Sequence, residues 1–159
     1  MKAYTYILLL LALTIELFAQ KSILVTNATI HVGNGTVIEK GALGIKNGKI
    51  SEIAPADKVG KGYEQTIDAK GQHLYPGFIA PNTQLGLVEI EAVRATNDFR
   101  EVGNFNPNVR SIIAYNTDSE IIPTIRSNGV LIAQITPQGG RMSGQSSVVH
   151  LDGDNYEEA

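Results

Sequence analysis

The chain has 159 residues, of which 43% are hydrophobic and 18% are charged, and its formal net charge is −3. This composition is typical of a folded domain and excludes a disordered or collagen-like chain. The slightly negative charge excludes a broad basic surface, so we expect no nucleic-acid partner. Because the chain contains no cysteine, it forms no disulfide, thiolate metal site or thiol nucleophile.

The first 19 residues have the layout of a secretory signal peptide. Lys2 provides a positive start, residues 7–15 form an apolar run, and Ala19 is a small residue at the expected cleavage point. The apolar run is shorter than the about 20 residues that a membrane-spanning helix needs. We therefore expect export to the periplasm, with no membrane association after cleavage. The alternative is an uncleaved N-terminal anchor, against which Glu16 argues.

Residues 20–75 are predicted to form short β-strands joined by tight turns. Asn47-Gly48 predicts a type I′ hairpin turn, because both residues tolerate a positive φ. Gly33-Asn34-Gly35 predicts a second turn for the same reason. The strand-forming segments are 22–26, 28–32, 43–46, 49–53, 66–68 and 72–75.

After Pro76 the pattern changes. Residues 81–114 are polar and charged without a clear period, which predicts either a functional loop or a helix whose position the pattern does not reveal. Two apolar segments, 130–135 and 147–151, are predicted strands. A short apolar run ends at Phe78-Ile79, and a helix is expected between this run and residue 130, so the order strand–helix–strand predicts a parallel βαβ unit.

The expected helix has signals at both of its ends. Thr117 and Glu120 have the spacing of a capping box, and Asn128-Gly129 is typical of a helix C-terminus. Pro123 either delays the start of this helix or kinks it, because proline has no N–H to donate. At the end of the chain, Asn155 followed by Glu157 and Glu158 predicts another helix N-cap. Because the sequence stops after one turn of this helix, we expect that the chain is truncated.

Three short motifs occur in a recognisable order: Ile50-Ser51-Glu52-Ile53, Ile67-Asp68-Ala69-Lys70-Gly71 and Tyr75-Pro76-Gly77-Phe78-Ile79. This order resembles the start of the amidohydrolase superfamily, especially its exported imidazolonepropionase-like members. The resemblance implies an α/β fold with a β-rich N-terminus. Part of a small β-sandwich (20–75) would follow the signal peptide (1–19). The first strands of an incomplete metal-dependent-hydrolase (β/α)₈ barrel (76–159) would come next.

The sequence departs from the family at the metal-binding motif of the first barrel strand. The family pattern is Pro-Gly-x-Ile-Asp-x-His-x-His, whereas Ala80, Asn82 and Gln84 stand in the places of its Asp and two His. Carboxamides are weak zinc ligands, so we expect no metal ligand and no catalytic residue in this chain. Asn82 and Gln84 are the candidate substrate-binding residues, since barrel enzymes bind ligands at strand C-termini. The alternatives are a degenerate metal pocket and a polar strand end without a function.

Other polar residues offer weaker signals. His31, His73 and His150 lack the spacing of a metal motif and are interpreted as surface or hydrogen-bonded structural residues. The charged residues at 89–101 are either a lid or, as we favour, a solvated loop. The glycine-rich stretch 139–147 favours a turn between strands over an anion cradle.

The resemblance implies an intact family that hydrolyses non-peptide C–N bonds, in cyclic amides and related compounds, with water activated by a divalent metal such as zinc. We expect no metal in this fragment and no activity, because a barrel needs roughly 250 residues. Expected partners are a small-molecule substrate and either a second copy or a paired amidohydrolase subunit. The alternatives are a non-catalytic pseudoenzyme acting as an exported binding subunit, and a self-contained β-rich binding module of the envelope.

Overall fold

The computed structural model describes residues 22–159. It divides the chain into two compact units, one ending at Pro76 and one beginning at Gly77. The expected signal peptide over residues 1–19 lies outside the described residues. Within the described part of the chain, no helix has the length and apolar character needed to cross a membrane.

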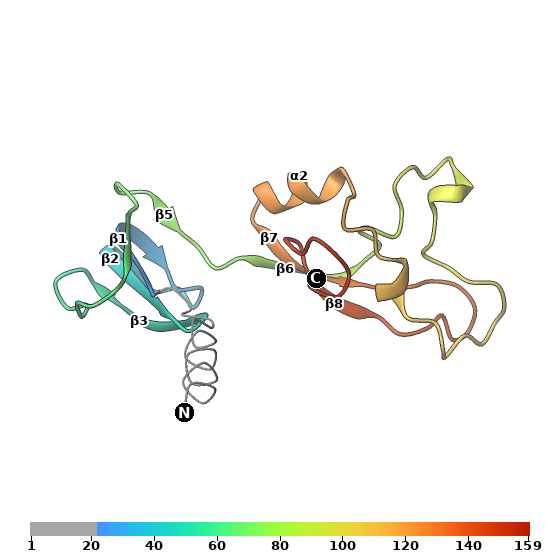
Figure 1. Ribbon diagram of the computed structural model, residues 1–159, viewed down its shortest axis with the longest axis horizontal. Coiled ribbons are helices and arrows are strands. Elements are labelled where there is room, and N and C mark those ends of the chain that lie inside the picture. Colours follow the sequence, from blue (N-terminus) through green and yellow to red (C-terminus); the bar gives the residue numbers. More distant parts are fainter. Residues whose placement is uncertain (1–21) are drawn as a thin grey trace, which may run out of the picture. The chain divides into compact units, whose positions relative to one another are not determined.

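Unit 1 is built on one mixed sheet, in which β1 is the central strand (Figure 1). β1 pairs antiparallel with β2, and parallel with both β4 and β5. β3 continues the sheet beyond β2 in antiparallel pairing. The strands are β1 (Ile23–His31), β2 (Val37–Lys46), β3 (Lys49–Pro55), β4 (Gln65–Asp68) and β5 (His73–Leu74).

Local turn chemistry accounts for much of this sheet. Asn47 and Gly48 have φ values of 53° and 68°, which confirms the type I′ turn between β2 and β3. The two strands expected at 22–26 and 28–32 are one strand, interrupted by a β-bulge at Asn27, whose φ is 54°. Asparagine tolerates this left-handed conformation, so the strand continues through the bulge.

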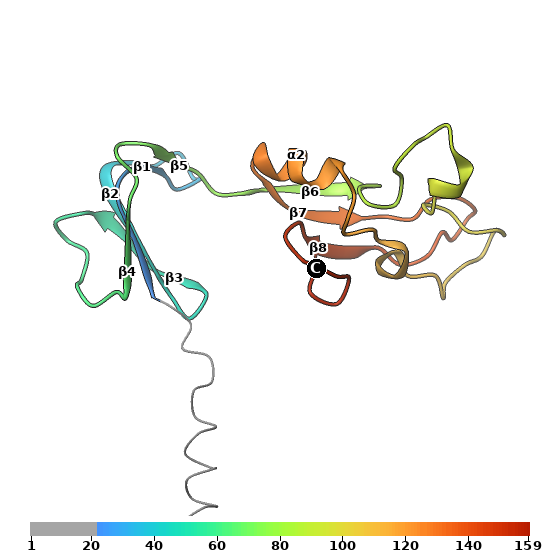
Figure 2. The same ribbon diagram turned by 45° about the horizontal axis from the view of Figure 1, so that its top comes forward.

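Unit 2 contains the second sheet, with the order β6-β7-β8 (Figure 2). β6 and β7 are parallel and α2 lies between them in the chain, which confirms the expected βαβ unit. β8 is antiparallel to β7. The elements are β6 (Phe78–Thr83), the 3₁₀ turns η1 (Arg94–Thr96) and η2 (Ser111–Ala114), α2 (Ile121–Ser127), β7 (Val130–Ile135) and β8 (Ser147–His150). Two sheets with little helix confirm the β-rich fold class.

The capping box predicted at Thr117 does not form, and α2 begins later, as the alternative of a start delayed by Pro123 allows; its predicted end is confirmed. The helix begins at Ile121 without a side-chain cap, and the Thr117 hydroxyl donates to the carbonyl oxygen of Asp154. Pro123 lies in the first turn, where backbone N–H groups have no intrahelical acceptor, so it is accommodated there. Asn128 is the C-cap, and Gly129 follows with a φ of 90°.

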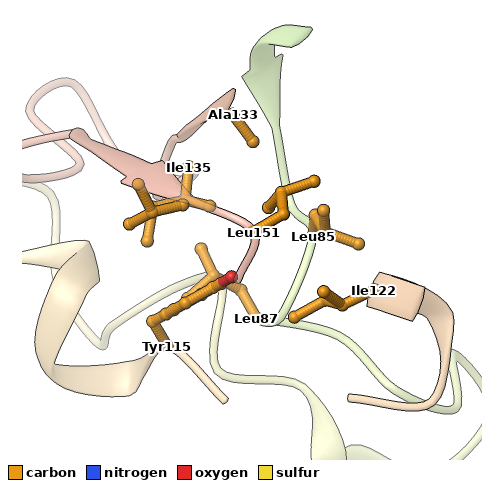
Figure 3. Close-up of a cluster of buried hydrophobic side chains, with 8 residues drawn as sticks. Leu85, Leu87, Tyr115, Ile122, Ala133, Ile135 and Leu151 are labelled. Atoms are coloured by element: carbon orange, nitrogen blue, oxygen red, sulfur yellow. The ribbon is translucent and has the colours of Figure 1, made fainter. Parts of the chain in front are cut away.

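The core of unit 2 lies between α2 and one face of the sheet (Figure 3). Leu85, Leu87 and Tyr115 bring both ends of the long segment after β6 into this core. Hydrophobic burial therefore anchors a segment that lacks regular structure. The buried cluster comprises Leu85, Leu87, Tyr115, Ile122, Ala133, Ile135, Val149 and Leu151.

The other face of this sheet is largely exposed and carries apolar side chains beside the polar Gln134 and His150. Ile79 is paired with Ile132, and Ile132 with His150, so these side chains share the face opposite to Ala133 and Val149. Ile79 is 64% exposed, and Val148 on the same face is 67% exposed. The sheet therefore has one covered face and one open face.

Candidate functional site

The carboxyl end of β6 contains a β-bulge. Ala80 is opposite Ala133 and Thr83 is opposite Ile135, so β6 has one residue more than β7 over this stretch. Asn82 lies within the bulge with a φ of 52° and is exposed. Because the bulge interrupts the regular alternation of side chains, Asn82 and Gln84 do not follow one continuous strand face.

Hydrogen bonds hold the turn that follows β6. The carbonyl oxygen of Thr83 accepts from the Thr136 N–H at 2.8 Å, which joins the ends of β6 and β7. The Thr83 hydroxyl accepts from the Leu85 N–H, and the Gln84 carbonyl accepts from the Leu87 N–H. Both leucines are buried, so Gln84 is attached to the core on its C-terminal side.

Gln84 lines a polar hollow of about 490 Å³ at this end of the two strands. Gln138, which follows β7, lines the same hollow, as do Arg94 and Arg100. Glu91 is the one carboxylate among the lining residues, so the charge of the lining is positive. The full lining is Gln84, Val88, Glu91, Ala92, Arg94, Asn97, Phe99, Arg100 and Gln138.

The segment that carries the arginines is held by its own side chains. The Thr96 hydroxyl donates to Ile90 and Val93 carbonyl oxygens, which closes the turn around η1. Asn97 Nδ2 donates to the carbonyl oxygen of Glu91 at 2.9 Å, whereas its Oδ1 is buried with no partner among the described residues. Asn97, which lines the hollow, therefore has a side-chain oxygen that is buried and can still accept a hydrogen bond.

A second hollow, of about 330 Å³, shares Phe99 and Arg100 with the first. The Gln138 N–H donates to the Phe99 carbonyl oxygen at 2.7 Å, which ties these residues to the loop after β7. Ser111 lines this second hollow, but its hydroxyl donates to the Ile135 carbonyl oxygen. The hydroxyl is thereby occupied by a structural bond.

The charged residues at 89–101 have different environments. Glu91, Arg94 and Arg100 line the polar hollow, as the lid interpretation expects. Glu89 instead accepts hydrogen bonds from Ser119 Oγ at 2.8 Å and Asn116 Nδ2 at 3.1 Å. This structural role of Glu89 has no local signal in the sequence, because its partners follow about thirty residues later.

The glycine-rich stretch connects β7 to β8. The backbone N–H groups of Arg141 and Met142 donate to the Asn104 carbonyl oxygen, and the Gln145 N–H donates to that of Val109. The Ser143 hydroxyl donates to the Gly139 carbonyl oxygen at 2.6 Å. These N–H and O–H groups donate to carbonyl oxygens of the protein, which agrees with a turn between strands and not with an anion cradle.

The histidines are distributed over both units. His31 and His73 meet in unit 1, where the distance from His31 Nε2 to His73 Nδ1 is 2.9 Å. His150 is exposed on β8 in unit 2. His31 and His73 are therefore hydrogen-bonded, as the sequence interpretation allowed.

Searches of family models and of curated proteins find no match to this chain. Among solved structures, an amidohydrolase from Thermotoga maritima MSB8 matches with a TM-score of 0.78 and 25% identity, over 86% of this chain and 35% of that one. The chain has the fold of the N-terminal portion of an amidohydrolase-superfamily protein. It spans little more than a third of the Thermotoga protein's length.

Two further solved structures match more weakly. L-Hydantoinase from Arthrobacter aurescens is 22% identical over 45% of this chain and 15% of its own, with a TM-score of 0.36. A putative prolidase from Bifidobacterium longum is 17% identical over 79% of this chain and 30% of its own, with a TM-score of 0.40.

The residues at the end of β6 do not fit the divalent metal that is typical of amidohydrolases. Asn82 and Gln84 offer carboxamides, which bind zinc weakly compared with imidazole. Asn82 is also absent from the lining of the hollow. Among residues 22–159, no three His, Cys, Asp or Glu side chains are grouped as a metal site.

Proposed function

We propose that this chain is part of a longer hydrolase that cleaves non-peptide C–N bonds, in cyclic amides and related small molecules. The likeness to the Thermotoga amidohydrolase, over 86% of the chain, supports the hydrolase class. We propose further that the chain contributes substrate binding and no metal ligand. The observation that carries this second part is the position of Gln84 in a polar hollow at the carboxyl ends of β6 and β7.

The lining of the hollow indicates what chemistry the substrate has. The side-chain amides of Gln84 and Gln138 can each donate and accept, which matches the N–H and C=O of an amide. Arg94 and Arg100 offer planar guanidinium groups, which bind carboxylates in a bidentate manner. We therefore propose a substrate that carries an amide together with a carboxylate.

Turnover by the full-length protein tests this proposal. The full-length protein is incubated with cyclic amides that do or do not carry a carboxylate, and mass spectrometry detects the products. Residues 22–159 alone are assayed in parallel with the same compounds. We expect turnover by the full-length protein, a preference for the carboxylates, and no turnover by the shorter chain. Arg100→Ala should raise KM about tenfold or more, since a hydrogen bond to a charged group contributes about 1.5–3 kcal/mol. Gln84→Ala should raise KM less, by about two- to tenfold, because a neutral hydrogen bond contributes about 0.5–1.5 kcal/mol.

Matched variants separate binding from folding in this assay. Gln72→Ala and Arg141→Ala change exposed residues of the same types that do not line the hollow, so their KM should stay at the wild-type value. No turnover of any compound would contradict the hydrolase. Binding of the amides without turnover would instead favour the exported binding subunit.

We also propose how the open face of the second sheet is covered. Ile79 and Val148 leave apolar surface exposed there, and apolar sheet faces are normally buried. We propose that further strands of the longer chain cover it. A second copy or a paired amidohydrolase subunit is the alternative, which light scattering of the purified full-length protein distinguishes by mass.

Export remains a proposal that rests on the sequence of residues 1–19. Fractionation of cells that express the full-length protein tests it. We expect the protein in the periplasmic fraction without its first 19 residues, and an uncleaved protein in the membrane fraction would favour the anchor.

A further inference from the structure

Three aromatic side chains gather on one face of β1 and β5 in unit 1. The two strands are parallel, with Thr29 opposite His73. Because side chains alternate along a strand, His31 and Tyr75 follow two residues later on the same face. The rings of His31 and Tyr75 are stacked, with centroids 4.1 Å apart and an angle of 11° between their planes.

Three atoms that can bind a metal converge within this cluster. His31 Nε2 lies 2.9 Å from His73 Nδ1, and the ring planes differ by 21°, so one imidazole donates a hydrogen bond to the other. The Tyr75 hydroxyl oxygen lies 3.5 Å from the same His73 nitrogen. One proton is therefore shared between two nitrogens that are otherwise available as ligands.

We propose that His31 and His73 form a binding site for a divalent transition-metal ion, with Tyr75 as a weaker third ligand. Imidazole nitrogens suit copper, nickel and zinc, and Cu²⁺ binds most tightly in the general order of these ions. Adjacent nitrogens of a square-planar ion, at bond lengths of about 2.0–2.1 Å, are about 2.9 Å apart. The hydrogen bond between the two imidazoles, which is also 2.9 Å long, therefore already holds both nitrogens within reach of one ion.

Binding requires little reorganisation of the backbone. The Thr29 N–H donates to the Gln72 carbonyl oxygen at 3.0 Å, so the pairing of β1 and β5 already holds both imidazoles on one face. On binding, the shared proton passes through water to the far nitrogen of the imidazole that donated it, so both rings stay neutral and each has a free lone pair. The exposed His73 ring would rotate about its side-chain bonds to direct its lone pair at the ion. The site lies wholly within unit 1, so the proposal does not depend on the proposed hydrolase.

Titration of the full chain with Cu²⁺ alone, followed by calorimetry and electron paramagnetic resonance, tests the site. We expect one equivalent bound, with magnetic coupling to two nitrogens. His31→Gln and His73→Gln should each weaken binding at least about tenfold, since even loss of an outer-shell partner costs that much, and should leave coupling to one nitrogen. Tyr75→Phe should cause a smaller loss.

His150→Gln is the matched control, because His150 is an exposed histidine on β8 in the other unit. Its affinity for Cu²⁺ should equal that of the wild type. Unchanged affinity in both His31→Gln and His73→Gln, or a loss confined to His150→Gln, would overturn the proposal and leave the pair as a tie between β1 and β5.

A measurement on the unaltered protein guards against variants that fail to fold. Cu²⁺ should slow the modification of His31 and His73 by diethyl pyrocarbonate, measured by peptide mass spectrometry, and should leave His150 unaffected. Equal modification of His31 and His73 with and without Cu²⁺ would overturn the site independently.

Discussion

The hydrogen bond between Glu52 and Tyr63 makes the stability of unit 1 depend on pH. The Tyr63 hydroxyl donates to Glu52 Oε1, and the Gly60 N–H donates to Oε2 at 3.3 Å. These two bonds lower the pKa of Glu52 below its ordinary value of 4.5, with the tyrosine as the larger cause. The same bond to Glu52 raises the pKa of Tyr63 above 10.0.

We predict that Glu52→Gln flattens the acid side of the stability profile. A carboxylate whose pKa is lowered by folding stabilises the fold fully above its unfolded value, and this contribution is lost as the pH falls through the folded value. The urea midpoint of the wild type should therefore drop more between about pH 6 and about pH 3 than that of Glu52→Gln. Glu64→Gln, at an exposed glutamate nearby, should behave as the wild type. An equal drop in Glu52→Gln and the wild type would contradict the prediction.

Only part of the candidate site could be predicted from single residues of the sequence. The family motif predicts that Asn82 and Gln84 lie two residues apart at the end of a strand. In the structure, Gln84 lines a polar hollow there. The bulge that separates their environments has one clue in the sequence, which is that asparagine accepts a positive φ. Arg94 and Arg100 could be named as charged, but their place in the hollow depends on contacts between loops.

Elements were predictable where the controlling interactions are local. The turn at Asn47-Gly48 and the end of α2 at Gly129 each depend on adjacent residues, and both are confirmed. The capping box predicted at Thr117 does not form, and the Thr117 hydroxyl bonds to Asp154, 37 residues away. The parallel pairing of β4 and β5 with β1 likewise joins segments about 42 residues apart, which no local pattern reveals.

Strand β8 provides a matched pair of neighbours on its two faces. Val149 is fully buried, whereas Val148 is 67% exposed. We predict that Val149→Ala lowers the free energy of unfolding of residues 22–159 by about 2 kcal/mol, because it removes buried carbon and leaves a cavity. Val148→Ala should change it by less than about 0.5 kcal/mol. Urea unfolding measures both, and similar losses would contradict the two-faced sheet.

At the scale of the whole molecule, the two faces of the second sheet differ in what covers them. α2 and the anchored ends of the 81–114 segment cover the face of Ala133 and Val149. The face of Ile79 and Val148 has no such cover in the described part of the chain. The matched part is only 35% of the Thermotoga amidohydrolase. The contrast between the two sheet faces therefore supports the proposal of a longer protein in which further strands cover the open face.

This view predicts that one substitution has different effects in two lengths of chain. In residues 22–159 alone, Val148→Ala should be nearly neutral because its side chain is solvated. In the proposed full-length protein, further strands would bury Val148, so the same substitution should lower the free energy of unfolding by about 1–2 kcal/mol. Urea unfolding of wild type and variant at both lengths measures the difference. A neutral effect at both lengths would show that Val148 stays solvated, and the open face would then have to be covered by a partner or not at all.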